Sequence, residues 1–231
     1  DAPAVRVIVN TGNGDAFQTG LDVVQLARDP EALREQSRRT KRAELRITAW
    51  HNKVWKPVIA AVNGTCAGGG LHFFADADIV IASTEATFLD PPVSVGQASA
   101  FETIALVRMS PMEPIVRMAL TGRHERMTAE RARQLGIVGE VVEPERLRDA
   151  ARELAEKVAR NSPAAMAATK RALWGALETG LTEACRNGAR ELVSMWGHPD
   201  QVEGPRAFVE RREPVWRPLD PAGARGGATR P

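Results

Sequence analysis

Residues 56–70 join an apolar, strand-like run to a glycine-rich turn, and this feature limits the fold more than any other in the chain. The run KPVIAAVN at 56–63 is typical of a buried strand. The following stretch, Gly64 to Gly70, contains four glycines and predicts a sharp turn, after which residues 71–77 predict a helix. Strand, glycine turn and helix in this order favour an α/β fold with a wound sheet.

The remaining segments predict an α/β core followed by a helical region. Strands are predicted at 5–10, 78–82, 86–90 and 138–142, and amphipathic helices at 30–55, 127–135, 144–160 and 163–194. We therefore divide the chain into a core over residues 1–142, a helical region over 143–217 and a tail over 218–231. The tail is rich in proline, glycine and arginine, a composition typical of disorder.

Composition bounds the class of protein and its partners. The chain has 231 residues and a formal net charge of +2, which argues against a nucleic-acid partner. No apolar run has membrane-spanning length and the first residues lack a signal-peptide pattern, so we expect a cytoplasmic protein without a membrane contact. Cys66 and Cys185 have no metal-ligand spacing, and no metal site is predicted. The absence of tyrosine removes one common general acid.

Two glycine turns follow neighbouring predicted strands. The first is AFQTGLD at 16–22 and the second is CAGGG at 66–70. Such turns can aim two backbone N–H groups at one oxygen, an oxyanion hole in which each donor is worth about 3–4 kcal/mol in acyl chemistry. A Gly-Gly-Gly stretch after a strand is also compatible with a tight packing turn. The second turn lacks the Lys-Ser/Thr pair of a phosphate loop, which argues against nucleotide hydrolysis.

Four motifs in order resemble those of the crotonase (enoyl-CoA hydratase/isomerase) superfamily. They are VRVIVNTG at 5–12 with AFQTGLD at 16–22, KPVIAAVNG at 56–64 with AGGG at 67–70, the segment from Thr121-Gly122 to Ile137-Val138, and DQVEGPRAFVERREP at 200–214. The resemblance covers nearly the whole chain. It implies a ββα spiral core, a helical C-terminal trimerisation region, and an acyl-CoA thioester as substrate. The family's initial strands and helix have no counterpart before Asp1.

The resemblance also assigns residues by position. It places the oxyanion amides at Leu21 and Gly69. Coenzyme A would enter as part of the substrate rather than as a permanently bound cofactor, and the assembly would be a homotrimer or a dimer of trimers. The CoA contacts implied by position are Thr19, Gly20, Asp22, Val23 and Gly68, with Phe208 and Arg211 reaching the CoA of another subunit.

The sequence departs from the family at its two catalytic glutamates. The first of these positions holds His72 and the second holds Pro92. We predict a His72–Asp90 pair instead, because Asp90 would point to the same side of an extended strand as residue 92. Glu102 is the third catalytic candidate, as an acid that activates water or protonates the α-carbon.

Each of these candidates also has a structural interpretation. His72 can be a structural residue of its helix, Asp90 can cap a turn, and Glu102 can favour a helix N-terminus. His51 is interpreted as a surface or packing residue of the predicted helix at 30–55.

Three functions remain open from the sequence. The first is enoyl-CoA hydratase-like addition or elimination of water, with a thioester enolate stabilised in the oxyanion hole. The second is hydrolysis of a CoA ester or of a carbon–carbon bond by a His/Asp pair. The third is acyl-CoA binding without catalysis, motivated by the loss of both glutamates.

Overall fold

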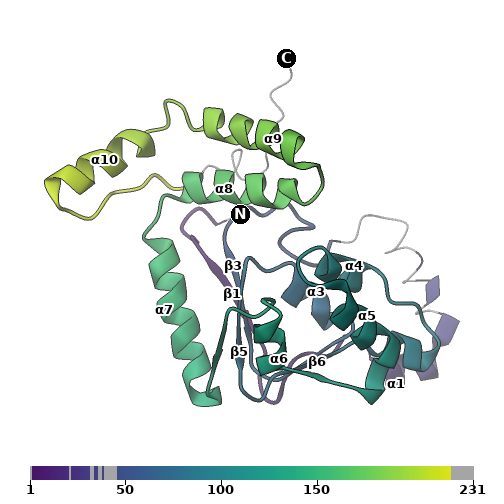
Figure 1. Cartoon of the computed structure of the whole chain (residues 1–231). Helices are drawn as coiled ribbons and strands as arrows, with labels where there is room; N and C mark the ends of the chain where they lie inside the picture. Colours follow the sequence, from purple (N-terminus) through teal and green to yellow (C-terminus); the bar gives the residue numbers. More distant parts are fainter. Residues whose placement is uncertain (1, 21, 32–33, 36–37, 39–45, 220–231) are drawn as a thin grey trace. The chain divides into compact units, whose positions relative to one another are not determined.

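The apolar run at 58–62 lies within a four-stranded sheet in the computed structural model, which describes residues 2–20, 22–31, 34–35, 38 and 46–219 (Figure 1). Every residue of this strand is buried, which is typical of a strand covered on both faces. The strand pairs in parallel with the next strand of the sheet, and that strand pairs in parallel with the last. The order of the sheet is β1 (Ile8–Thr11), β3 (Val58–Val62), β5 (Ile79–Ser83) and β8 (Glu140–Val142).

A second sheet is built from strands of only two or three residues. Its order is β2 (Ala16–Gln18), β4 (Thr65–Ala67), β6 (Thr87–Leu89) and β7 (Met127–Thr128). The first three pair in parallel, and β7 pairs antiparallel with β6. The sequence predicts only β6 among these four, because such short strands carry too little periodicity to be recognised.

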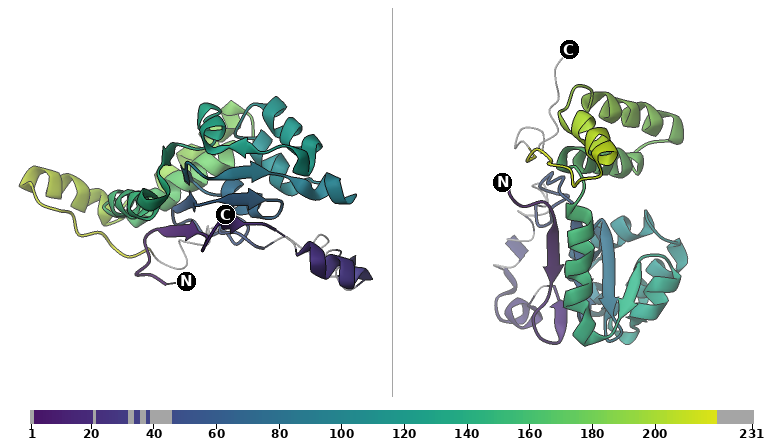
Figure 2. Two further views of the ribbon diagram at one scale, coloured as in Figure 1. Left: turned by 90° about the horizontal axis from the view of Figure 1, so that it is seen from below. Right: turned by 90° about the vertical axis from the view of Figure 1, so that its left-hand side faces the viewer.

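The strands and helices repeat in a ββα order along the chain (Figures 1 and 2). Each of the three repeats up to α5 contributes one strand to the first sheet, one to the second, and then a helical segment, whereas the last strands follow the order β7, α6, β8. This arrangement confirms the predicted ββα spiral core. The helical segments that follow β2, β4 and β6 are α1 (Val23–Arg28), α3 (Gly70–Ala75), and the 3-10 helix η1 (Pro91–Val95) with α4 (Phe101–Val107) and α5 (Met112–Thr121).

Helices dominate the second half of the chain. Thr128 caps one of them by accepting a hydrogen bond from the Arg131 amide, as its position predicts. The single helix predicted over 163–194 is wrong: the chain forms two helices that pack on each other. The first ends in tight i→i+3 bonds at Leu177, and the next begins after Gly180. The elements are η2 (Gly122–His124), α6 (Ala129–Gln134), η3 (Pro144–Arg146), α7 (Leu147–Ala159), α8 (Pro163–Ala176), α9 (Leu181–Ser194) and α10 (Asp200–Glu210).

Of the helix predicted over 30–55, residues 30–31, 34–35 and 38 are helical, and the prediction is wrong from residue 46 onward. Residues 32–33, 36–37 and 39–45 lie outside the described residues, and residues 46–55 form turns rather than a helix. The Asn52 side chain donates hydrogen bonds to the carbonyls of Arg46 and Thr48, which competes with helical hydrogen bonding. Lys53 then adopts a left-handed conformation with φ 53°.

The chain divides into two compact units. The helical unit holds residues 1–8, 53–58 and 152–231, and the core unit holds residues 9–52 and 59–151. This division falls within α7 and adds two short early segments to the helical unit. The domain boundary expected at 142/143 stays a prediction. A role of the helical unit in trimerisation stays a prediction.

Within the helical unit, Asp200 fastens the segment that follows α10. Its carboxylate accepts hydrogen bonds from the Ser162 hydroxyl and from the Arg217 amide at 3.0 Å. Ser162 also caps α8 through the Ala165 amide. Of the predicted tail, residues 220–231 lie outside the described residues, whereas Leu219 is buried. Within the described part of the chain, no helix combines the length and the apolar composition needed to cross a membrane.

Candidate active site

The turns after β2 and β4 come together as the backbone pattern predicts. β2 and β4 are parallel neighbours, so their following turns leave the same edge of the second sheet. Gly20, with φ 82°, approaches so closely that an added Cβ would lie 2.8 Å from the Gly69 nitrogen. A Cβ on Gly70 would overlap the Gln18 carbonyl oxygen. Glycine is therefore required at both positions, and the Gly69 amide lies beside the first turn.

His72 is held in the helix that follows the second turn. It lies in the first turn of α3 and is buried, with a relative exposure of 6%. Its Nε2 atom is 3.5 Å from Glu102 Oε2, and both side chains are largely shielded from solvent. α3 packs on α4, which carries Glu102. The structure therefore joins His72 to Glu102, and the predicted pair with Asp90 is not formed.

Asp90 is buried without a hydrogen-bonded partner. It follows β6, its relative exposure is 0%, and neither carboxylate oxygen has a hydrogen-bond partner among the described residues. Burial raises the pKa of Asp90 to about 6, and the negative charge of Glu102 adds to this rise. The nearby Ser99 hydroxyl opposes this rise in the pKa of Asp90. That hydroxyl is hydrogen-bonded to Thr103 at 3.3 Å and not to Asp90. Although Asp90 stands at the N-terminal end of η1, its side chain makes no capping hydrogen bond to that helix.

Three residues that the sequence analysis missed, Thr48, His51 and Asp76, form a cluster that reaches His72 through the ring of His51. Thr48 Oγ1 donates to Asp76 Oδ2 at 2.6 Å and lies 2.6 Å from His51 Nδ1. His51 Nδ1 is itself 3.3 Å from Asp76 Oδ2. The rings of His51 and His72 meet edge to face, with 5.7 Å between centroids. His51 is therefore part of the site rather than a surface residue.

Only one of these partners was visible in the sequence. His72 and Asp76 are four residues apart on a predicted helix, a spacing that places both on one face. His51 gave no such signal because the turns at 46–52, and not a helix, bring it to α3. Burial lowers the pKa of His51; Asp76 opposes this shift and His72 adds to it.

His51, His72 and Asp76 are also of the residue types that bind metal ions. Among the described residues, one ligand atom from each lies within 4.8 Å of the others. A bound Zn²⁺ would need each atom about 2.0–2.2 Å away. The Thr48 hydroxyl already bonds to the nearest nitrogen and oxygen of this set, so the geometry favours a hydrogen-bonded cluster over a metal site.

Comparisons with known proteins agree with this architecture. The sequence model of the family described as enoyl-CoA hydratase/isomerase matches residues 1–218. The chain belongs to this family. It is accordingly a member of the crotonase superfamily and an enoyl-CoA hydratase/isomerase-like lyase, whose substrates are thioesters of coenzyme A and whose activity is hydratase-like.

Three relatives illustrate the similarity. (E)-Benzylidenesuccinyl-CoA hydratase from Thauera aromatica is 38% identical over 221 residues, which cover 93% of this chain and 82% of that protein. Carnitinyl-CoA dehydratase from Citrobacter koseri is 34% identical over 222 residues, covering 94% and 83%. The crystal structure of an enoyl-CoA hydratase/isomerase from Mycobacterium paratuberculosis matches with a TM-score of 0.82 and 38% identity, covering 94% of this chain and 82% of that one.

The residues expected to contact CoA in this hydratase/isomerase family member lie at the first turn, at the second turn and in the helical unit. Thr19, Gly20 and Asp22 follow β2, and the Asp22 side chain accepts a hydrogen bond from the Val24 amide at 2.8 Å. Val23 begins α1, and Gly68, with φ 50°, shapes the second turn. Leu21, the other predicted oxyanion donor, lies outside the described residues. Phe208 and Arg211 belong to the helical unit, so their contact with CoA stays a prediction.

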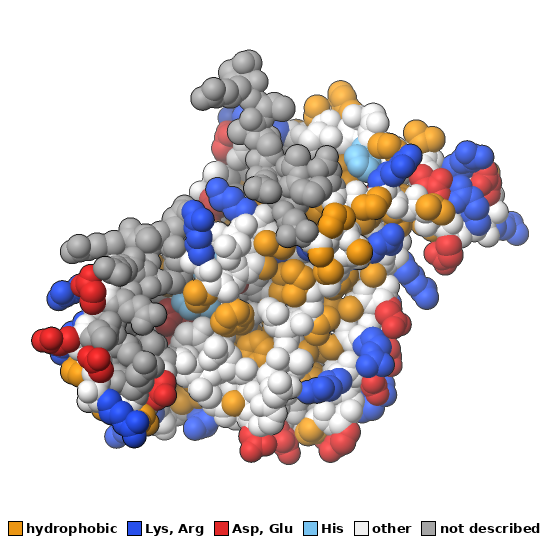
Figure 3. All heavy atoms as spheres, turned by 180° about the vertical axis from the view of Figure 1, so that it is seen from behind, with side chains coloured by type: hydrophobic (Ala, Val, Ile, Leu, Met, Phe, Trp, Pro, Cys, Tyr) orange, Lys and Arg blue, Asp and Glu red, His pale blue; other side chains and the backbone are white. Residues whose placement is uncertain are grey.

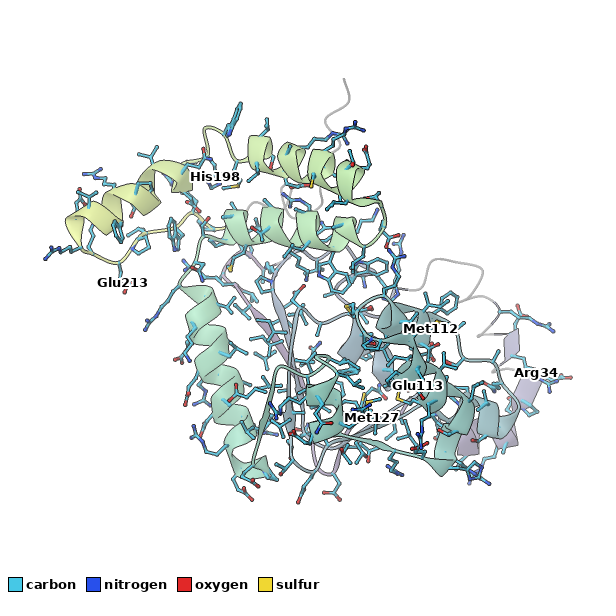
Figure 4. All side chains as sticks on the ribbon, in the orientation of Figure 1. Arg34, Met112, Glu113, Met127, His198 and Glu213 are labelled. Atoms are coloured by element: carbon cyan, nitrogen blue, oxygen red, sulfur yellow. The ribbon has the colours of Figure 1, made fainter. Side chains whose placement is uncertain are left out.

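A separate cavity in the hydratase/isomerase core does not include any of these residues. It has a volume of about 330 Å³ and is lined by residues of α5, β7 and α6, including Glu113, Met127 and Arg131 (Figure 4). Arg117 and Glu125 in its wall pair with each other at 2.8 Å. This cavity holds none of the candidate catalytic residues, and we assign it no role in the chemistry.

Proposed function

We propose that this protein adds water to, or removes water from, an enoyl-CoA thioester. The observation that supports this most is the convergence of the two glycine turns beside the helix that carries His72. The thioester oxygen would accept hydrogen bonds from the amides of Gly69 and Leu21, which stabilise the enolate formed in the reaction. His72, Glu102 and Asp90 would supply the proton transfers.

In the hydration direction, His72 acts as the general base. Its imidazole takes a proton from water while the oxygen of that water bonds to the β-carbon, and the double-bond electrons move to the thioester oxygen. Glu102, 3.5 Å from Nε2, stabilises the imidazolium that forms. This pairing replaces the two family glutamates with a histidine and one carboxylate.

Asp90 supplies the proton that the α-carbon needs. With a pKa of about 6, roughly a tenth of its carboxyl groups are protonated at neutral pH. Collapse of the enolate onto this proton completes the addition of one water, and exchange with solvent restores His72 and Asp90. Elimination runs through the same steps in reverse.

The same His72–Glu102 pair also favours a second function. An imidazole paired with Glu102 can also activate water to attack a thioester or ketone carbonyl, which gives hydrolysis of the CoA ester or of a carbon–carbon bond. The oxyanion turns serve both reactions. The third function, acyl-CoA binding without turnover, remains as an outcome of the test.

The proposed assembly is a homotrimer or a dimer of trimers. Large apolar side chains are exposed on the helical unit, among them Trp196, Phe208 and Val209, with 74%, 86% and 80% exposure. Apolar side chains also gather on the face shown in Figure 3. Exposed apolar surface of this kind supports contacts between subunits. Sedimentation velocity measures the mass of the assembly directly.

The test is turnover of short, long and aromatic enoyl-CoAs by the wild type and by His72→Ala, with products identified by mass. We expect the wild type to add one water and the variant to lose this activity. Release of free coenzyme A or of acyl fragments would favour the hydrolase. Binding of acyl-CoA without any product would favour the non-catalytic function.

A further inference from the structure

His51 stands next to the proposed base without having a role in the chemistry described above. Its side chain is 13% exposed, and it belongs to the turns at 46–52, a segment remote in sequence from α3. Its Nδ1 atom faces Thr48 and Asp76, and its ring contacts that of His72. The positions of the protons on this partly buried histidine follow from its neighbours.

Counting protons assigns the tautomer of His51. A threonine hydroxyl has one proton, and Thr48 gives it to Asp76 Oδ2 at 2.6 Å. Thr48 Oγ1 must therefore accept at the 2.6 Å contact with His51, so the proton of that contact resides on Nδ1. The backbone amide of His51 points to the same oxygen at 3.4 Å, which agrees with Thr48 as the acceptor.

The surrounding groups keep the His51 ring neutral. His72 of α3 and Asp76, which directly follows α3, face it. Trp50 contacts it edge to face within its own segment, and Glu102 of α4 lies beyond His72. Burial is the largest effect and lowers the pKa of His51 despite Asp76. A neutral ring does not repel a proton that arrives on His72, whereas a second imidazolium at this distance would.

We propose that His51 is a positioning residue, locked by Thr48 and Asp76 as the neutral Nδ1–H tautomer, that holds the His72 imidazole against Glu102. This inference rests on the proposed function in so far as His72 is the base. His72 then lies between a fixed ring and a carboxylate, which limits both its rotamer and its tautomer. Orientation of this kind matters because a misplacement of about 1 Å can cost about a hundredfold in rate.

The most direct test follows His72 itself rather than turnover. Imidazole ¹⁵N shifts report the tautomer of each of the four histidines in the chain, with assignment by His51→Ala and His72→Ala. We expect His51 to be the Nδ1–H tautomer in the wild type. Thr48→Val should change the ¹⁵N shifts of both His51 and His72, and Thr48→Ser, which keeps the hydroxyl, should restore the wild-type shifts. Unchanged His72 shifts in Thr48→Val would overturn the proposal.

Activity gives a second, independent measure. Thr48→Val should lower kcat about tenfold or more with KM within about twofold, and Thr48→Ser should recover at least about half of that loss. Asp76→Asn provides a second variant if Thr48→Val does not fold. The exposed His124→Ala is the matched control. If His72→Ala abolishes turnover and the Thr48 and Asp76 variants leave kcat unchanged, the positioning role is wrong while the proposed function stands.

A third measurement separates this proposal from metal binding. Equilibrium dialysis of the whole protein against ZnCl₂ should show no stoichiometric uptake that depends on Asp76, and turnover should survive a chelator. One Zn²⁺ per chain, lost in Asp76→Asn, would overturn the hydrogen-bonded interpretation. If the wild type shows no turnover on any enoyl-CoA while the ¹⁵N shifts behave as expected, the proposed function fails and the positioning of His72 stands.

Discussion

The candidate site consists of a backbone half and a side-chain half, and the backbone half was predicted from the sequence more completely than the side-chain half. The backbone half consists of the turns after β2 and β4, whose glycines permit contact between Gly20 and Gly69. The side-chain half consists of His72, Glu102, Asp90 and the His51 cluster. Glycine turns are local in sequence, whereas the side-chain partners come from segments tens of residues apart. Local geometry can therefore be predicted from sequence, and partnership between distant side chains cannot.

The largest effect should come from removing the side-chain half. His72→Ala eliminates the proposed base and should lower kcat about a thousandfold, within the range of general acid–base catalysis. The measurement is steady-state turnover of an enoyl-CoA, with His124→Ala as the control for histidine replacement on the surface. A variant within about threefold of the wild type would show that the side-chain half does not perform the chemistry.

Disturbing the backbone half should have the next largest effect. Gly70→Ala places a Cβ against the Gln18 carbonyl and forces the two turns apart, so kcat should fall about a hundredfold through loss of oxyanion alignment. Gly188→Ala is the matched control because it lies on α9 with open space around it, where alanine should slightly stabilise the helix. Equal activity in both glycine variants would contradict the close approach of the turns.

Glu102→Gln tests the side-chain half of the site, because it keeps the shape of the side chain and removes its charge. The proposed His72–Glu102 pair predicts a loss in kcat of about tenfold to a hundredfold, because the imidazolium loses its stabilising carboxylate. KM should change little. A pH profile that is the same in the variant and in the wild type would assign the pairing a structural role only.

The smallest expected effect is on stability, and it is a gain in stability rather than a loss of activity. The folded pKa of Asp90, about 6, lies above its ordinary value of 3.8, so the native state binds the proton more tightly than the unfolded state does. Stability from this group is present at low pH and is lost as pH rises from about 4 to 6. Asp90→Asn should therefore raise the free energy of unfolding at pH 7 by up to about 3 kcal/mol, with the gain disappearing near pH 4.

Urea unfolding of the wild type and Asp90→Asn at pH 4 and pH 7 checks this prediction. Asp149, on the exposed surface of α7, provides the control substitution Asp149→Asn. A destabilised Asp90→Asn at pH 7 would mean that the ionised carboxylate has a partner in solution. The Asp90 carboxyl would then be unsuited to the role of proton donor.

The elements of the fold show how far sequence reasoning extends. The strand at 58–62 and the cap at Thr128 were predictable because each carries its own local pattern. The strands β2 and β4 were not, since three residues carry no period, yet they set the edge from which both glycine turns leave. The helix over 30–55 was wrong beyond residue 45 because Asn52 draws the backbone into turns.

The candidate site follows the same division. The position of His72 after the glycine turn was predictable from the motif, and so was the presence of a nearby carboxylate. Which carboxylate it was could not be predicted, because the choice between Asp90 and Glu102 depends on how α4 packs on α3. The two acids consequently have different proposed tasks, stabilising the imidazolium and donating a proton.

The central claim is that the two halves act together to add water at the β-carbon of an enoyl-CoA. The most direct test is a reaction of crotonyl-CoA in ¹⁸O-labelled water, with the product fragmented in the mass spectrometer. The account predicts one labelled oxygen on the β-carbon of an intact CoA thioester, and none in His72→Ala. Label in a free carboxylate, or a substrate that stays unlabelled while it binds, would contradict it.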